Sequence, residues 1–181
     1  MPRIQPIAPA DAEPRVASTL RGVEHKLGIL PNVIATLGRS PAALDGYLGL
    51  SGALGAGALT GREREIVAIA VAQENACGYC LSAHATMGRG AGLSDGDITM
   101  ARDGEAADRR EQAIVAFALA VTRRRGGIDD ADLAAARDAG LEDGVLVETV
   151  AHVAVNLLTN YVNRVAETTV DFPEVDLQRA A

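Results

Sequence analysis

Apolar residues recur at helical spacing along almost the whole chain of 181 residues. On one face of an α-helix such residues stand three or four positions apart. Stretch 143–168 shows the longest run of this kind, with Val147, Val150, Ala154, Leu157, Leu158, Tyr161 and Val165. No stretch alternates apolar and polar residues between turn signals, which is the pattern of a strand. The sequence therefore predicts an all-α protein.

Capping and stop signals divide the chain into further helices. Thr60 and Glu63 fit a capping box, in which each side chain bonds the other residue's backbone amide. Ser40 and Ser94 stand where N-caps would, and glycines or prolines follow the apolar runs. The predicted helices cover about 13–27, 33–37, 41–50, 61–73, 78–89, 95–101, 107–125, 131–139 and 143–168.

The length fits one compact domain over residues 1–181. Residues 1–12 hold three of the seven prolines and predict an extended arm, and residues 170–181 predict a polar tail. Aromatic residues make up 3% and tryptophan is absent, so the core must consist of Ala, Val, Leu and Ile. Such small side chains favour closely packed helices that complete their burial between subunits, and we expect a homo-oligomer.

The charge balance excludes one class of partner. A net charge of −7 and a pI near 4.9 argue against nucleic acid, which needs a surplus of Lys and Arg on one face. The basic run 123–125 is better explained as a helix C-terminal cap. No secretory signal and no apolar run of membrane-spanning length is visible, so we expect a cytoplasmic protein that does not enter a membrane.

The only two cysteines lie in the run Cys77-Gly78-Tyr79-Cys80. His84 follows the second cysteine by four residues, and Glu65 precedes the first by twelve. In a reducing compartment a structural disulfide is rare, and a Cys-x-x-Cys pair indicates redox chemistry or metal binding. These four side chains are the candidate catalytic residues.

Helical geometry gives the two thiols different surroundings. On a helix His84 lies one turn beyond Cys80 on the same face, and about two turns from Cys77. His84 is therefore placed to take the proton of Cys80, whereas the helix N-terminal dipole favours a thiolate at Cys77. We expect Cys80 to attack, because a positioned proton acceptor also protonates the leaving group. Glu65, on the preceding helix, is placed to orient His84 or to pass its proton onward.

This motif resembles the core of the AhpD-like alkylhydroperoxidases, within the carboxymuconolactone decarboxylase superfamily. The resemblance is sharp over residues 59–92, and Asn156, Asn160, Asn163 and Arg164 in the last helix are compatible with it. It implies an all-helical peroxidase that assembles as a trimer or hexamer and needs no cofactor. It also implies that Cys80 is peroxidatic and Cys77 resolving, with Glu65 and His84 in a proton relay.

The implied cycle reduces organic or hydrogen peroxides. Cys80 becomes a sulfenic acid, Cys77 captures it as a disulfide, and a lipoyl-type or thioredoxin-like dithiol donor restores both thiols. The best-known members carry a histidine immediately before the second cysteine, where this chain has Tyr79. A relay role for position 79 is therefore an open question.

Other interpretations remain beside this one. The superfamily includes decarboxylases, and a helical oligomer whose cysteines sense oxidant without turnover fits the same residues. A zinc site from Cys77, Cys80 and His84 needs a fourth ligand, such as Glu65 or His152. We otherwise interpret His152 as a hydrogen-bonded core histidine, because apolar residues surround it in the sequence, and His25 as a surface residue.

Overall fold

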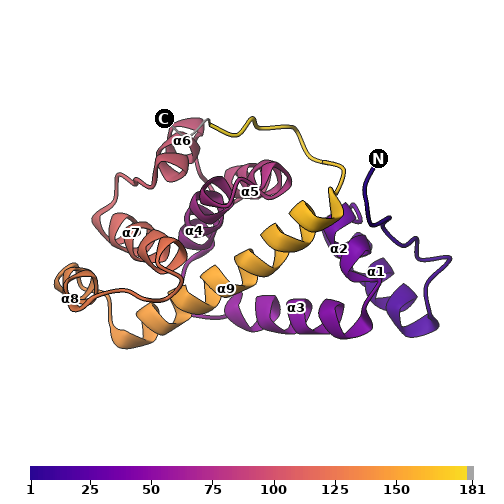
Figure 1. Ribbon diagram of the computed structural model, residues 1–181, viewed down its shortest axis with the longest axis horizontal. Coiled ribbons are helices and arrows are strands. Elements are labelled where there is room, and N and C mark those ends of the chain that lie inside the picture. Colours follow the sequence, from indigo (N-terminus) through magenta and orange to yellow (C-terminus); the bar gives the residue numbers. More distant parts are fainter. Residues whose placement is uncertain (179–181) are drawn as a thin grey trace.

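The computed structural model describes residues 1–178, and over that range the chain forms nine α-helices and no strand. The all-α prediction is confirmed (Figure 1). In chain order the helices are α1 (Pro14–Leu27), α2 (Asn32–Leu37), α3 (Pro41–Leu54), α4 (Gly61–Glu74), α5 (Gly78–Gly90), α6 (Asp95–Asp103), α7 (Arg109–Arg123), α8 (Asp130–Asp138) and α9 (Asp143–Ala166).

Helix α4 lies at the centre and contacts α5, α6, α7 and α9. Seven consecutive residues of α4, from Ile66 to Ala72, are buried, so almost every side of this helix meets another helix. Small side chains such as Ala68 and Ala70 allow this close approach. The long helix α9 crosses the molecule diagonally between α3 and the α4–α5 pair (Figure 1).

The interior is built from two apolar clusters. One contains the cysteines, Leu20 and Ile69, and joins α1–α3 to α4 and α5. The other, which contains Val67 and Ile114, lies between α4, α7, α8 and α9. Because α4 contributes to both clusters, it fixes α5 relative to α9, and those two helices carry the candidate site.

The predicted N-caps form in the structure, so local sequence signals determine where these helices begin. Ser40 and Thr60 accept hydrogen bonds from backbone amides three residues further on. Reciprocal capping boxes form at Thr60–Glu63, Ser94–Asp97 and Asp129–Asp132. Each box satisfies backbone donors that a helix start leaves unpaired.

The C-terminal segment is packed, in contrast to the expected polar tail. Val170, Phe172, Val175 and Leu177 pack against the cysteine-containing cluster. The backbone amide of Val175 also donates to Ser82 Oγ at 3.0 Å. The segment is polar on the whole, but these four apolar residues are the ones that pack against the cluster. Residues 179–181 of the expected tail lie outside the described part of the chain.

Helix α9 has the length and hydropathy of a membrane-spanning segment. Half of its most apolar window is buried inside the fold, however. Core helices of soluble proteins share this composition, so the observation is weak evidence for a membrane.

Candidate active site

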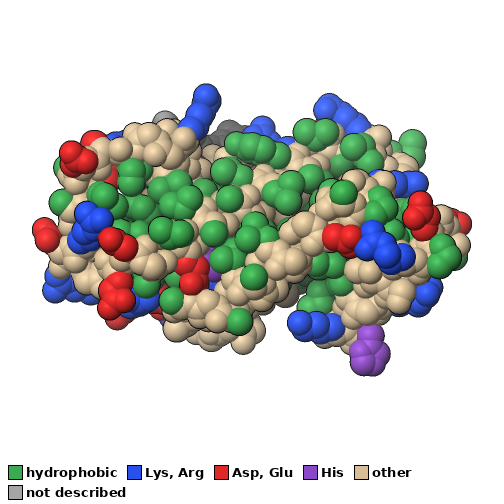
Figure 2. All heavy atoms as spheres, turned by 90° about the horizontal axis from the view of Figure 1, so that it is seen from below, with side chains coloured by type: hydrophobic (Ala, Val, Ile, Leu, Met, Phe, Trp, Pro, Cys, Tyr) green, Lys and Arg blue, Asp and Glu red, His purple; other side chains and the backbone are tan. Residues whose placement is uncertain are grey.

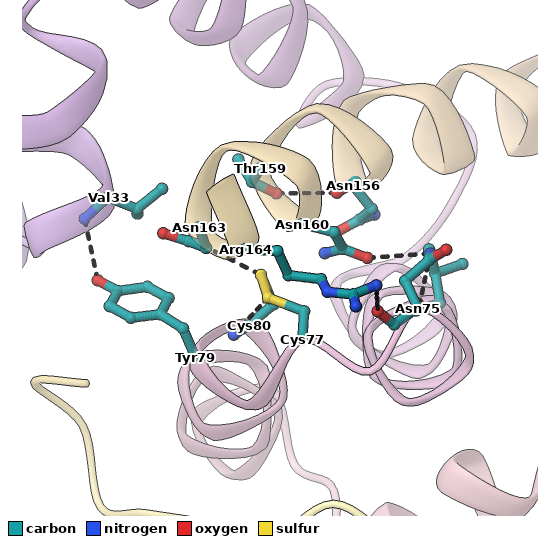
Figure 3. Close-up of a disulfide and its surroundings, with 11 residues drawn as sticks. Val33, Asn75, Cys77, Tyr79, Cys80, Asn156, Thr159, Asn160, Asn163 and Arg164 are labelled. Carbon is teal, nitrogen blue, oxygen red and sulfur yellow. Dashed lines mark hydrogen bonds between the residues drawn. A yellow bond between two sulfur atoms is a disulfide. The ribbon is translucent and has the colours of Figure 1, made fainter. Parts of the chain in front are cut away.

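The turn between α4 and α5 presents the two cysteines to α9. Asn75 caps α4, and its side-chain amide donates to Asn160 Oδ1 at 3.1 Å (Figure 3). Arg164 Nη1 donates to the backbone oxygen of Asn75 at 2.8 Å. Two residues of α9 thus hold the turn in place, and Cys77 follows it as the N-cap of α5.

Cys77 and Cys80 are joined as a disulfide, with their Cα atoms 5.3 Å apart. Both are buried, at 1% and 2% exposure. Cys77 Sγ accepts a hydrogen bond from the backbone amide of Cys80 at 3.3 Å, as an N-cap side chain does. From α9, the side-chain amide of Asn163 donates to Cys80 Sγ at 3.2 Å (Figure 3). Each sulfur therefore has a hydrogen-bond donor that favours negative charge.

Glu65 and His84 are in contact, which the spacing in the sequence alone could not establish. Glu65 Oε2 lies 2.9 Å from His84 Nδ1, and both side chains are 18% exposed. A carboxylate only accepts hydrogen bonds, so the proton of a neutral His84 ring sits on Nδ1 and leaves Nε2 as a free base. The pair is an oriented acid–base group one helical turn from Cys80.

An apolar cavity of about 420 Å³ adjoins this group. Cys80 and His84 both line it, whereas Cys77 is absent from the described residues of its wall. Most of the remaining wall is aliphatic or aromatic, including Ile34, Tyr79 and Phe172. The cavity therefore presents one cysteine sulfur and one imidazole to an apolar ligand.

His84 also lines a smaller chamber of about 100 Å³. Its wall is polar and includes Glu65, His152, Asn156 and Thr159. Its volume suits a few water molecules. His84 therefore contacts both the apolar cavity and the polar chamber, as Tyr47 and Thr159 also do.

His152 lies on the wall of the polar chamber and is buried, at 5% exposure. Its Nε2 atom has no hydrogen-bond partner among the described residues and lies 3.7 Å from Glu148. Burial lowers the pKa of His152, and the charge of Glu148 partly offsets this. The expected core position is correct, but the expected hydrogen bond is missing from Nε2.

Glu148 is held by two backbone amides rather than by His152. Its carboxylate accepts from Ala58 N at 2.7 Å and from Leu59 N at 2.8 Å. Burial, the largest single influence, raises the pKa of Glu148, but these two bonds together with the charges of His152 and Arg64 lower the pKa overall. Glu148 therefore stays ionised and ties α9 to the segment before α4.

A known protein family matches the segment of the chain that carries this geometry. Residues 41–107, which contain the cysteines and the Glu65–His84 pair, match the model of the Carboxymuconolactone decarboxylase family. Over these residues the sequence is that of the carboxymuconolactone decarboxylase family. No curated protein matches the sequence significantly.

Solved structures show that this chain has the AhpD-like fold. The AhpD core of a peroxidase-related protein from Ralstonia eutropha JMP134 superposes with a TM-score of 0.85 at 24% identity, covering 94% of this chain and 92% of that one. A peroxidase-related protein from Silicibacter sp. TM1040 gives 0.77 at 23% identity, with 87% and 85% covered. A variant of the debrominase Bmp8 in complex with 2,3,4-tribromopyrrole gives 0.78 at 21% identity, with 93% and 91% covered.

Tyr79, the residue immediately before the second cysteine, connects α5 to other parts of the fold. Its hydroxyl accepts from the backbone amide of Val33 at 3.2 Å, and its ring meets Phe172 edge-on at 5.9 Å. Burial raises the pKa of Tyr79, and the nearby Asp171 raises it further. Tyr79 therefore stays protonated and anchors α5 to α2.

No role for the asparagines of α9 was predicted from the sequence. Asn156, Asn160 and Asn163 are all buried. They recur at steps of four and three, so they form a polar stripe on the inner side of the helix. That stripe was visible in the sequence, but its partner, the α4–α5 turn, is more than 80 residues away.

Metal binding finds no support in this geometry. Across residues 1–178, no group of three or more His, Cys, Asp or Glu side chains is arranged to hold a metal ion. The cysteines bond to each other, and His84 pairs with Glu65.

Proposed function

We propose that this protein is a thiol-dependent peroxidase that reduces organic hydroperoxides. One observation carries the proposal: of the two cysteines, Cys80 lines the apolar cavity, and His84 lines it beside Cys80. A hydroperoxide bound there meets one cysteine sulfur and one acid–base group together. The superfamily and the AhpD-like fold support this chemistry.

In the first step the Cys80 thiolate attacks the terminal oxygen of the O–O bond. The bond breaks, the sulfur is oxidised to a sulfenic acid, and the alkoxide leaves. His84, having taken the thiol proton, returns a proton to the alkoxide, so one alcohol forms for each hydroperoxide. Glu65 stabilises the imidazolium that exists between these two events, because its carboxylate lies 2.9 Å from Nδ1.

In the second step Cys77 attacks the sulfenic sulfur and releases water. The product is the Cys77–Cys80 disulfide that the structure contains. Both sulfurs already lie within one helical turn, so the step needs no large movement of the chain. The position of Cys77 at the N-terminus of α5 favours its reactive thiolate.

A dithiol donor then reduces the disulfide through a mixed disulfide, and its own two thiols become a disulfide. Because the cysteines are at most 2% exposed, the donor reaches sulfur through the cavity rather than on the outer surface. A slender lipoyl-type arm fits this route better than the surface of a thioredoxin-like protein. Attack on Cys80 releases Cys77 as a thiolate, which the helix N-terminus stabilises.

The apolar wall selects the substrate class. The wall of this cavity of about 420 Å³ is mostly aliphatic and aromatic, and polar side chains such as Thr86, Asn163 and Asp171 are its minority, so it offers hydrogen peroxide few hydrogen bonds. An alkyl or aryl hydroperoxide gains by burying its apolar part there. Organic hydroperoxides are therefore the preferred substrates, and hydrogen peroxide is a poorer one.

Reductive dehalogenation is a second candidate. The aromatic rings of Tyr79 and Phe172 in the cavity wall suit a halogenated ring, and the debrominase Bmp8 shares the fold. Such a reaction replaces halogen by hydrogen and takes two electrons from the same dithiol pair. Decarboxylation needs no dithiol, and oxidant sensing needs no repeated turnover, so these alternatives are distinguishable as well.

The test is turnover of the full chain with a lipoyl-type dithiol and one of two substrates. Cumene hydroperoxide is expected to give cumyl alcohol over many cycles, and tribromopyrrole to give no bromide. Bromide release without alcohol formation would replace the peroxidase proposal with dehalogenation. A single oxidation that the dithiol does not reverse would favour a sensor. We also propose that the protein acts in the cytoplasm, where dithiol donors are kept reduced.

A further inference from the structure

The apolar wall of the large cavity continues to the outside of the molecule. Leu27, Ile29 and Met87 all line the cavity, and they are exposed at 54%, 44% and 41%. Leu27 ends α1, Ile29 follows it, and Met87 lies on α5, so two segments far apart in the sequence form one apolar mouth. Cys80 lines the same cavity, so an apolar surface leads from the solvent to the reacting sulfur.

Exposure alone does not distinguish these three residues from others. Figure 2 shows hydrophobic side chains across the middle of the face seen from below, and scattered exposed apolar residues are normal. The residues of the mouth differ because a cavity lies behind them. A ligand that fills the cavity and extends over the mouth buries further apolar surface and binds more tightly.

Asp171 supplies the negative charge at this cavity. It is the only carboxylate, and neither Lys nor Arg occurs, among the described residues of the wall. Asp171 is exposed, and its Oδ2 atom accepts a hydrogen bond from the backbone amide of Asn32 at 2.7 Å. The side chain of Asn32 also donates to the backbone oxygen of Thr169 at 3.0 Å. Asn32 therefore holds the carboxylate of Asp171 in place beside the cavity.

A negatively charged ligand finds no free cationic partner in this wall. The one basic side chain there, His84, already pairs with Glu65. Lys26 precedes Leu27 in the sequence but is absent from the described residues of the wall. A ligand carboxylate would therefore lose water without gaining an ion pair, and Asp171 would repel it.

We infer that the cavity takes uncharged hydroperoxides with a long apolar part, such as esters of fatty-acid hydroperoxides, and rejects the free acids. This inference rests on the proposed peroxidase function and narrows its substrate class. The hydroperoxide group lies at Cys80, the apolar part fills the cavity, and its end lies over the three apolar residues of the mouth. Asp171 takes no part in the chemistry and determines specificity by excluding anions.

A matched pair of substrates tests the charge preference. The para-carboxylate of cumene hydroperoxide and its methyl ester have nearly the same size and the same reacting group. With the wild-type protein, the second-order rate constant should be about three- to fivefold higher for the ester, because a like charge at an exposed site repels weakly. The same ratio measured with free dithiothreitol corrects for any difference in intrinsic reactivity.

Asp171→Asn keeps the shape of the side chain and an acceptor for Asn32, and it should bring the corrected ratio close to one. Asp176→Asn, the same change at an exposed position outside the described wall, is the control and should keep the wild-type ratio. Raising the ionic strength to about 0.5 M should shrink the ratio in the wild type, because salt screens exposed charges.

The apolar mouth is tested with a longer substrate. For the hydroperoxide of methyl linoleate in a fixed amount of detergent, relative to cumene hydroperoxide, Leu27→Ser should lower kcat/KM about fivefold through lost apolar burial. Leu50→Ser, at an exposed leucine of α3 outside the described wall, is the control and should keep the wild-type value. Equal values in the two variants would contradict the role of the mouth.

The outcomes separate this inference from the proposed function. Equal corrected rates for the acid and the ester in the wild type would overturn the inference and leave the peroxidase proposal intact. A faster acid would overturn it as well, and would assign the mouth to a cation such as Lys26. Alcohol from neither substrate would overturn the peroxidase proposal and the inference together.

Discussion

Asn163 donates a hydrogen bond of 3.2 Å to Cys80 Sγ, although 83 residues separate the two in the sequence. The donor is buried at 4% exposure, and its helix α9 packs against α5. In the reduced enzyme the same amide is placed to stabilise the thiolate. In the sulfenic acid it is placed to hold the oxidised sulfur near Cys77.

Replacing Asn163 therefore slows the peroxide step. Asn163→Leu has nearly the same shape and removes the donor, and a hydrogen bond to a charged group contributes about 1.5–3 kcal/mol. We expect at least a tenfold fall in the second-order rate constant with cumene hydroperoxide, measured by stopped flow. Asn163→Asp should be slower still, because a carboxylate repels the thiolate. An unchanged rate in both folded variants would remove Asn163 from the mechanism.

Glu65 and His84 should behave as one unit. His84→Gln removes the base, and Glu65→Gln removes the charge that supports its protonated form. General acid–base groups typically contribute about 10²–10⁴ in rate. We expect each single variant to lose at least about tenfold in the peroxide step, and the double variant to lose no more than His84→Gln alone. Losses that multiply in the double variant would show that the two residues act separately.

His152 makes the stability of the fold depend on pH. Burial lowers its pKa in the folded state below the ordinary value of 6.5, and Arg64 lowers it further, while Glu148 and Glu65 act in the opposite direction. At a pH between the lowered pKa and 6.5, the unfolded chain therefore binds a proton at His152 and the folded chain does not. The contribution of neutral His152 is present above pH 6.5 and is lost as the pH falls through the lowered pKa.

Urea unfolding between about pH 5 and 8 measures this effect. The free energy of unfolding should fall less steeply towards low pH in His152→Gln than in the wild-type protein. His25→Gln, at an exposed position, is the control and should keep the wild-type slope. Equal slopes in the wild type and His152→Gln would contradict the assignment.

Tyr79 is expected to matter for stability through its hydroxyl. Tyr79→Phe keeps the ring against Phe172 and leaves the buried amide of Val33 without a partner. The cost of such a group is about 1–3 kcal/mol in the free energy of unfolding. Chemical denaturation should show this loss in Tyr79→Phe and little change in Tyr161→Phe, whose side chain is exposed. Equal stability of the two variants would mean that water satisfies the Val33 amide.

Helix positions could be predicted from sequence because their signals are local. The capping pair Thr60–Glu63 lies within four residues, and its two hydrogen bonds form as expected. The Cys80–His84 arrangement follows from one helical turn. Contacts of this range depend little on the rest of the chain.

The orientation of α9 could not be predicted in the same way. Its most regular apolar residues, such as Val147 and Tyr161, face outward, and the inward side carries Asn160 and Asn163. Helical period identifies a helix but does not say which of its sides faces the interior of the fold. The polar inner side serves the α4–α5 turn, which no local pattern reveals.

The central claim is that Cys80 attacks and Cys77 resolves, and single turnover of the reduced protein tests it directly. With one equivalent of cumene hydroperoxide under anaerobic conditions, the wild type should release one equivalent of alcohol and form the Cys77–Cys80 disulfide, seen by intact mass. Cys77→Ser should release the same alcohol and keep a sulfenic acid on Cys80 that dimedone traps, while Cys80→Ser should release none. Alcohol formation by Cys80→Ser, together with an inert Cys77→Ser, would reverse the two roles and contradict the account.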